Sequence, residues 1–210
     1  MPPKLLIFDF DGTLADTFSL SLEIFDDAAK KFRFRPLDRE NLALLRGMTA
    51  RQIFAHHGVQ LYKLPLLARY MRASMQNHMH EISIFDGVDT MLRELSEKQA
   101  VLTVLSSNAS AVVEHVLSST HVGRFHHIEC GSSIFGKASR IRRMLDMTGI
   151  ASSDALLIGD EIRDIEAARQ VKIPFGAVAW GYTRLDVLLQ HDVQHVFLRP
   201  EMIVSELYGG

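Results

Sequence analysis

Continuous apolar runs alternate with helical stripes along most of the chain. The first run covers residues 4–8 and ends abruptly in polar residues, and similar runs recur at 101–105, 125–129, 155–158, 175–179 and 195–198. Apolar runs of this length are typical of parallel strands that are buried on both faces. Between them, apolar residues recur at helical spacing, as at Met91, Leu92 and Leu95. The alternation predicts an α/β fold with a doubly wound parallel sheet.

Residues 15–84 depart from this alternation, and we expect only helices there. One apolar stripe with helical spacing contains Phe18, Leu22, Phe25, Ala29 and Phe32. Thr49 opens a capping-box motif, and Pro65 suits the first turn of a later helix. We therefore predict a small all-helical cap over residues 15–84, seated over the carboxyl edge of the sheet. The α/β core then consists of residues 1–14 and 85–210.

Composition and charge exclude several classes of function. The chain of 210 residues is 47% apolar and 23% charged, with a formal net charge of -2. Its basic cluster at 30–35 is interrupted by phenylalanines, so we expect no nucleic-acid partner. No apolar stretch has the length of a membrane span, and the N-terminus lacks a signal-peptide pattern, so we expect a cytoplasmic protein. The single cysteine, Cys130, excludes an intrachain disulfide.

Acidic residues follow two of the predicted strands, at the sheet edge where open α/β folds bind ligands. Asp9 and Asp11 come after the first run, and Asp160 comes after the run at 155–158. Only Phe10 separates Asp9 from Asp11, so in extended geometry both carboxylates point to the same side. Burying such carboxylates together is costly unless a cation compensates their charge. Three acids form a hard oxygen site that suits Mg²⁺, with a phosphate supplying further ligands.

Further polar residues stand at strand ends or helix starts. Ser106, Ser107 and Asn108 follow the run at 101–105, and Lys137 opens the helix before the next acidic strand end. Taken singly, each has an ordinary interpretation, because Ser and Asn often cap helices and a helix-end lysine is usually solvated. Their occurrence in order together with the three acids favours one shared site.

With these motifs in place, the sequence resembles the haloacid dehalogenase superfamily in its phosphatase form. The run from Phe8 to Thr17 is similar to the family's first signature, Ser106 to the second and Lys137 to the third. The run from Gly159 to Asp164 is similar to the fourth. The match covers the whole core, and the cap lies where members with a cap after the first strand carry it. The pattern is most similar to the phosphoglycolate phosphatase-like branch.

The resemblance implies a Mg²⁺-dependent phosphohydrolase that forms an aspartyl-phosphate on Asp9. Asp11 would protonate the leaving oxygen and later take a proton from water. Ser106 and Lys137 would hydrogen-bond or neutralise the transferring oxygens. The implied metal ligands are Asp9 and Asp160 through their side chains, Asp11 through its backbone carbonyl, and Asp164 directly or through water. The residues expected to bind the phosphate are Gly12, Thr13, Ser107 and Asn108.

The cap is expected to set the choice of substrate, because the core contacts only the phosphoryl group. Arg46 lies in a polar turn between two cap helices, and we predict that it binds a carboxylate or hydroxyl of the substrate. Its ordinary interpretation is an exposed helix-end arginine. A cap that closes over the site excludes large polymers, so we expect a small soluble phosphomonoester. We expect the protein to be a monomer or a homodimer.

Several alternative functions are weighed against this prediction. Dehalogenases of the superfamily lack the second acid of the first signature, so Asp11 counts against that activity. A phosphonatase would need a cap lysine in a context that lowers its pKa, and no cap lysine has one. A non-catalytic phospho-ligand-binding module would be expected to lose Asp9, Asp11 or Lys137. A phosphomutase of the β-phosphoglucomutase type retains all four signatures and stays open.

Overall fold

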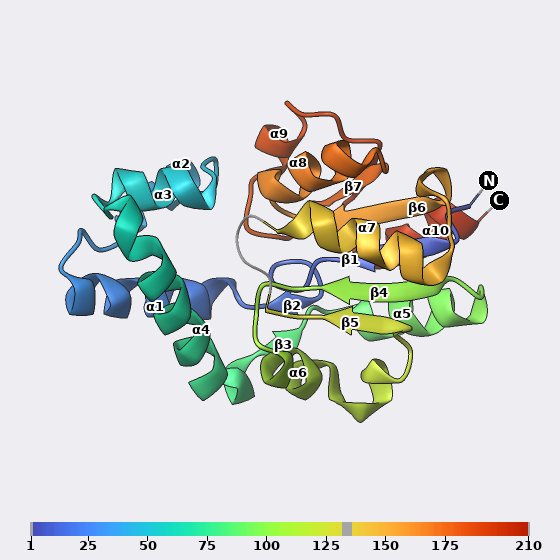
Figure 1. Cartoon of the computed structure of the whole chain (residues 1–210), viewed down its shortest axis with the longest axis horizontal. Helices are drawn as coiled ribbons and strands as arrows, with labels where there is room; N and C mark the ends of the chain where they lie inside the picture. Colours follow the sequence, from blue (N-terminus) through green and yellow to red (C-terminus); the bar gives the residue numbers. More distant parts are fainter. Residues whose placement is uncertain (1, 132–135, 210) are drawn as a thin grey trace.

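The computed structural model describes residues 2–131 and 136–209, so the outer limits 1 and 210 of the predicted core lie outside the described residues (Figure 1). The strands of its large sheet are β1 (Leu5–Phe8), β4 (Val101–Leu105), β5 (His127–Glu129), β6 (Ala155–Gly159), β7 (Phe175–Val178) and β8 (His195–Phe197). The sheet has the order β5-β4-β1-β6-β7-β8 with all neighbours parallel. Each of the predicted apolar runs contains a strand, which confirms the predicted parallel sheet.

Both faces of this sheet are covered because its central strand is apolar throughout. In β1, Leu6 and Phe8 pack into one hydrophobic cluster, while Leu5 and Ile7 pack into another on the opposite face. The first cluster is closed by α5 (Val88–Glu97), α6 (Ser110–Val122) and α10 (Glu201–Tyr208). The second is closed by α7 (Lys137–Thr148), α8 (Ile162–Val171) and α9 (Leu185–Leu188). The sheet is therefore doubly wound, as predicted.

A block of helices is inserted between β1 and β4. Its α-helices are α1 (Phe18–Phe32), α2 (Leu42–Leu45), α3 (Ala50–His56) and α4 (Leu64–Asn77). Figure 1 places them beyond the arrowheads of the strands, at the carboxyl edge, with both chain termini at the opposite end. The Thr49 capping box and the early position of Pro65 in α4 are confirmed. The limits 1–14, 15–84 and 85–210 stay a prediction.

The expectation of helices alone between residues 15 and 84 is wrong at both ends. Two short strands, β2 (Ala15–Asp16) and β3 (Ser83–Ile84), pair antiparallel at the base of the helical block. Strands of two residues carry no measurable alternation of apolar and polar side chains, so no pattern in the sequence could indicate them. Their pairing joins the entry and exit of the insertion, which fixes both connections to the core.

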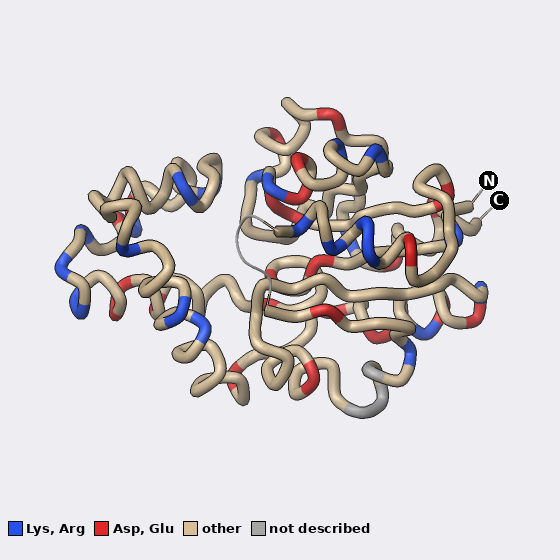
Figure 2. The backbone as a smooth tube through the Cα atoms, in the orientation of Figure 1, with Lys and Arg blue, Asp and Glu red and all other residues tan. Residues whose placement is uncertain are grey.

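Charge is distributed over the whole molecule. Figure 2 shows basic and acidic residues interspersed along the core and the helical block. None of the helices in the described part of the chain is both long and apolar enough to traverse a membrane.

Candidate active site

The loop after β1 carries the first two acids to the edge of the sheet. Asp9 is buried, and its N–H donates to the carbonyl of Ile158 in the neighbouring β6 at 2.9 Å, which holds the backbone in place. Gly12 follows with a φ of 77°, and a Cβ there would lie 2.3 Å from Oδ2 of Asp160. Only glycine therefore fits the close approach between this loop and the end of β6.

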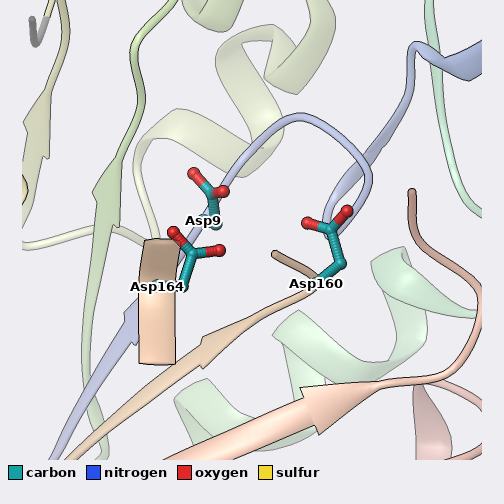
Figure 3. Close-up of side chains that lie close together, drawn as sticks. All are labelled: Asp9, Asp160 and Asp164. Atoms are coloured by element: carbon teal, nitrogen blue, oxygen red, sulfur yellow. The ribbon is translucent and has the colours of Figure 1, made fainter. Parts of the chain in front are cut away.

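Three carboxylates converge at the junction of β1 and β6, where the order of the strands reverses. Asp9 follows β1, Asp160 follows β6, and Asp164 stands in the first turn of α8. Figure 3 shows the three side chains facing one another, and one oxygen from each lies within 4.8 Å of the others. All three residues are buried. The junction is the expected ligand site of a doubly wound sheet.

Lys137 supplies the positive charge that these acids require. As the first residue of α7, it directs its Nζ to Oδ1 of Asp9 at 2.9 Å and to Oδ1 of Asp164 at 2.6 Å. Burial alone would raise the pKa of Asp9, but the charges of Lys137 and Arg163 outweigh it and hold the pKa below its usual range. Asp9 is therefore ionised at neutral pH.

The negative charges of Asp160 and Asp164 are not fully compensated by nearby positive charges. Burial, followed by repulsion from neighbouring acids, raises the pKa of Asp160 well above its usual value. Burial and the charge of Asp9 raise the pKa of Asp164 to about 7. Oδ2 of Asp9 is also buried and has no hydrogen-bond partner within the described residues. Converging oxygens and raised pKa values fit a hard divalent cation, so these acids form a candidate metal site.

Asp11 is held by a residue from the next strand. Asn108, just after β4, donates its Nδ2 to Oδ1 of Asp11 at 3.1 Å, while Oγ of buried Ser106 accepts from the Asn108 N–H at 2.9 Å. Burial and the neighbouring charge of Asp9 raise the pKa of Asp11 to about 6. Ser107 lines the hollow in front of Asp11.

Two predicted phosphate ligands use their backbone N–H groups elsewhere in this structure. Gly12 N–H donates to the carbonyl of Ala15, and Thr13 N–H donates to the carbonyl of Phe10. The Thr13 hydroxyl donates to Oδ1 of Asp160 at 2.9 Å. These bonds close the loop after β1 and fix the Asp160 carboxylate, while binding of phosphate by the two N–H groups stays a prediction.

Arg46 lies at the border between the helical block and the core. Its Nε donates to the carbonyl of Tyr182 and its Nη2 donates to the carbonyl of Gly181, both at 2.9 Å. Its guanidinium also lies 5.3 Å from the ring centre of Phe18. Two of its donors thus join the cap to the core, and a contact with substrate stays a prediction.

Trp180, nearby, donates to the carbonyl of Thr13 and packs edge-on against Phe85.

Sequence reasoning assigned no role to two residues of the site. Arg163 is engaged by Glu161 at 2.7 Å, yet its buried Nε has no partner among the residues described. Tyr182 donates its N–H to Oδ2 of Asp160, while its hydroxyl bonds with Thr17 and Ser21 at the start of the cap. Arg163 lies inside the fourth signature, so its place in the sequence could have indicated that it belongs to the site. Nothing in the sequence indicated the contacts of Tyr182.

Comparison with known proteins decides the family. Residues 6–178, most of the chain, match the family model described as haloacid dehalogenase-like hydrolase. The chain belongs to the haloacid dehalogenase-like hydrolases. This hydrolase is 30% identical to a phosphoglycolate phosphatase of Synechococcus elongatus over 85% of each chain. It is 27% identical to the pyrophosphatase PpaX of Listeria monocytogenes over 84% of this chain and 83% of the relative.

Solved structures carry the same fold. A predicted phosphatase from Clostridium acetobutylicum superposes with a TM-score of 0.84 over the full length of both chains, at 20% identity. The likeness to phosphoglycolate phosphatase places the hydrolase in the phosphoglycolate phosphatase-like branch, with its cap between β1 and β4. The chain is a phosphohydrolase of this superfamily, and its buried acidic triad is consistent with a metal site.

Proposed function

We propose that the protein is a Mg²⁺-dependent phosphatase that removes phosphate from a small phosphomonoester through an aspartyl-phosphate on Asp9. The observation that carries the proposal is the state of the Asp9 carboxylate. Its Oδ1 is held by Lys137, its Oδ2 is buried without a partner within the described residues, and its lowered pKa keeps it ionised. A carboxylate that is fixed, charged and free at one oxygen is suited to attack phosphorus.

In the first step, an Asp9 oxygen forms a bond to phosphorus while the bond between phosphorus and the leaving oxygen breaks. Asp11 gives its proton to that leaving oxygen, and its pKa of about 6 supports this role because an acid works best near the operating pH. Asn108, which donates to Asp11, holds the carboxyl in place. The alcohol then leaves with the proton from Asp11.

In the second step, water attacks the phosphorus of the aspartyl-phosphate. Asp11, now ionised, takes a proton from this water, and the bond between phosphorus and Asp9 breaks to release inorganic phosphate. Asp9, Asp160 and Asp164 would hold Mg²⁺, with Asp11 contributing its backbone carbonyl. Bound Mg²⁺ supplies charge compensation for the phosphoryl oxygens. Lys137 and Ser106 add a fixed cation and a hydroxyl close to the same group.

The test is phosphate release from ethyl phosphate, with and without Mg²⁺, by the wild type and by Asp9→Asn. We expect release that stops in chelator, returns with Mg²⁺, and falls at least about a thousandfold in Asp9→Asn, since an amide is not a nucleophile. Acid quenching should trap phosphate on the wild type and not on the variant. The matched control is Asp154→Asn, whose carboxylate pairs with Lys4 at the surface.

Full activity in chelator, or retention of a tenth or so of the rate in Asp9→Asn, would contradict the proposal. The same assay with a sugar phosphate present tests the phosphomutase alternative. A mutase would pass the phosphoryl group from the enzyme to the sugar, whereas a phosphatase releases it to water as inorganic phosphate.

A further inference from the structure

Beside the phosphoryl site lies a cavity of about 270 Å³, lined by the helices of the cap and by the core loops after β4, β6 and β7. Its cap walls are mainly apolar, and they include Phe18, Leu22, Phe25, Leu45, Ile53 and Phe54. The volume is close to the lower end of the ~300–1,000 Å³ found for small-molecule sites. A cavity of ~150 Å³ can take up benzene, so this one has room for a substituted ring or a short alkyl chain.

The cavity adjoins a smaller hollow at the acid Asp11, which stands two residues after the nucleophile Asp9. This hollow of about 150 Å³ lies in front of Asp11 and Asn108. Ser107, Arg163 and Tyr182 line both this hollow and the larger cavity. A phosphomonoester bound with its phosphorus next to the nucleophile therefore projects its leaving group between these residues and into the apolar cavity.

Few charges are available in the cavity for a polar leaving group. Arg46 is engaged by core carbonyls, and Arg163 is paired through its Nη2 with Glu161, while its buried Nε has no partner among the described residues. Arg72 of α4, at the neck between the hollow and the cavity, is half-buried and has neither a hydrogen bond nor an ion pair with any residue that the structure describes. It can meet an oxygen close to the phosphoryl group. Beyond the neck, the walls of the cavity are formed mainly by apolar side chains.

This lining fits neither substrate named for the two relatives. The leaving group of phosphoglycolate is a two-carbon acid, and that of pyrophosphate is a second phosphate. Either would leave most of the apolar wall in contact with water, and the desolvation of that wall would contribute nothing to binding. A leaving group of mainly apolar surface would gain about fourfold in affinity for each methylene it buries there.

We propose that the cap cavity binds the leaving group of the substrate and that this group is a predominantly apolar alcohol or phenol. The inference rests on the proposed phosphatase function and names its substrate class. The cap of this chain then selects by hydrophobic burial, with Arg72 as the polar contact at the neck.

The first arm of the test compares ethyl, butyl and hexyl phosphate, whose leaving groups have similar intrinsic reactivity. We expect kcat/KM to rise at least about tenfold from ethyl to butyl phosphate and again to hexyl phosphate, with Mg²⁺ present. Hexyl phosphate should also be used better than phosphoglycolate and pyrophosphate.

The second arm fills the cavity. Ala68 of α4 lines the cavity but not the hollow at Asp11, whereas Ala73 of the same helix is exposed. Ala68→Phe should bring the hexyl-to-ethyl ratio of kcat/KM to within about threefold, because it lowers kcat/KM for hexyl phosphate far more than for ethyl phosphate. Ala73→Phe should change neither. If Ala68→Phe does not fold, Ala50→Phe fills the same cavity from the start of α3.

The outcomes separate the two proposals. Equal kcat/KM for the three alkyl phosphates, or an equal loss for ethyl and hexyl phosphate in Ala68→Phe, would overturn the apolar substrate class and leave the phosphatase proposal standing. Better use of phosphoglycolate or pyrophosphate than of hexyl phosphate would do the same. Absence of phosphate release from every ester tested would overturn both.

Discussion

The phosphoryl site and the cap cavity share lining residues but differ in how their side chains are held. In the phosphoryl site, the side chains are ionisable and fixed by contacts between strand ends and helix starts: Asp9 and Asp164 are buried, and Lys137 is largely covered. In the cavity, most of the lining from α1 to α4 is apolar, and its polar side chains, such as Ser21 and Arg46, stand at the border with the core. A change in the first region removes a charge from a compensated set, whereas a change at an apolar position of the second alters shape alone. We therefore expect the chemistry common to all substrates to belong to the core and discrimination between substrates to belong to the cap.

The largest effect that tests this difference between the two regions is expected from removing the ammonium group of Lys137. Lys137→Ala should lower kcat/KM by about 10²–10³-fold, because a preorganised charge beside the transferring oxygens is lost. The loss should be equal for ethyl and hexyl phosphate, since Lys137 contacts Asp9 and Asp164 at the phosphoryl site. Steady-state kinetics with both esters measures it. A loss confined to hexyl phosphate would place Lys137 in substrate selection instead.

The same contrast explains how much could be predicted from the sequence. The large sheet and the acids at its edge follow from apolar runs that end in Asp9 and Asp160, because strand ends in a parallel sheet must meet. The bond from Tyr182 to the cap could not be predicted, since it depends on how the loop after β7 meets α1. The position of Arg46 in a polar turn of the cap could be predicted from the sequence. Its bonds to carbonyls 135 and 136 residues away could not, because contacts so distant along the chain leave no local pattern.

A smaller effect concerns the stability of the metal-free protein. In the folded state the pKa of Asp11 is about 6 and that of Asp164 is about 7, whereas an unfolded carboxyl has a pKa near 3.8. As pH rises, both residues therefore keep their protons to a higher pH in the folded protein than in the unfolded chain. Between about pH 4 and pH 7 these two carboxyls therefore bind more protons in the folded state than in the unfolded chain, so their contribution to the free energy of unfolding falls as pH rises. In chelator, the melting temperature should drop from pH 5 to pH 7.5.

Mg²⁺ should reverse that loss. Protons and metal compete for the same carboxylates, so saturating Mg²⁺ should raise the melting temperature by more at pH 7.5 than at pH 5. Asp164→Asn removes one titrating group and should flatten the dependence measured in chelator. A melting temperature that rises over this window in chelator, in the wild type and the variant alike, would show that other groups control it.

The smallest expected effect is at Arg46, where the two regions meet. Its guanidinium donates to the carbonyls of Gly181 and Tyr182, and its own carbonyl accepts from the N–H of Arg184 at 3.0 Å. Gly181 and Tyr182 also lie against Asp160, because a Cβ on Gly181 would be 2.1 Å from the Asp160 Cβ and the Tyr182 N–H donates to its Oδ2. Arg46 is thus placed to hold the cap over a loop that orients a candidate metal ligand.

Arg46→Ala should cost about 1 kcal/mol of stability, less than a hydrogen bond to a fully buried charge, because the freed carbonyls can be hydrated. For a chain of this size that lowers the melting temperature by about 2–4 °C. If Arg46 acts by holding the loop, kcat/KM should fall equally for ethyl and hexyl phosphate, and Arg46→Lys should restore little, since one ammonium cannot reproduce the two-pronged contact. If Arg46 instead binds the leaving group, as its position in the sequence predicted, phosphoglycolate should suffer more than either alkyl phosphate. Because hexyl phosphate carries no polar group beyond its phosphate, the three esters together distinguish a contact with the substrate from the support of Asp160.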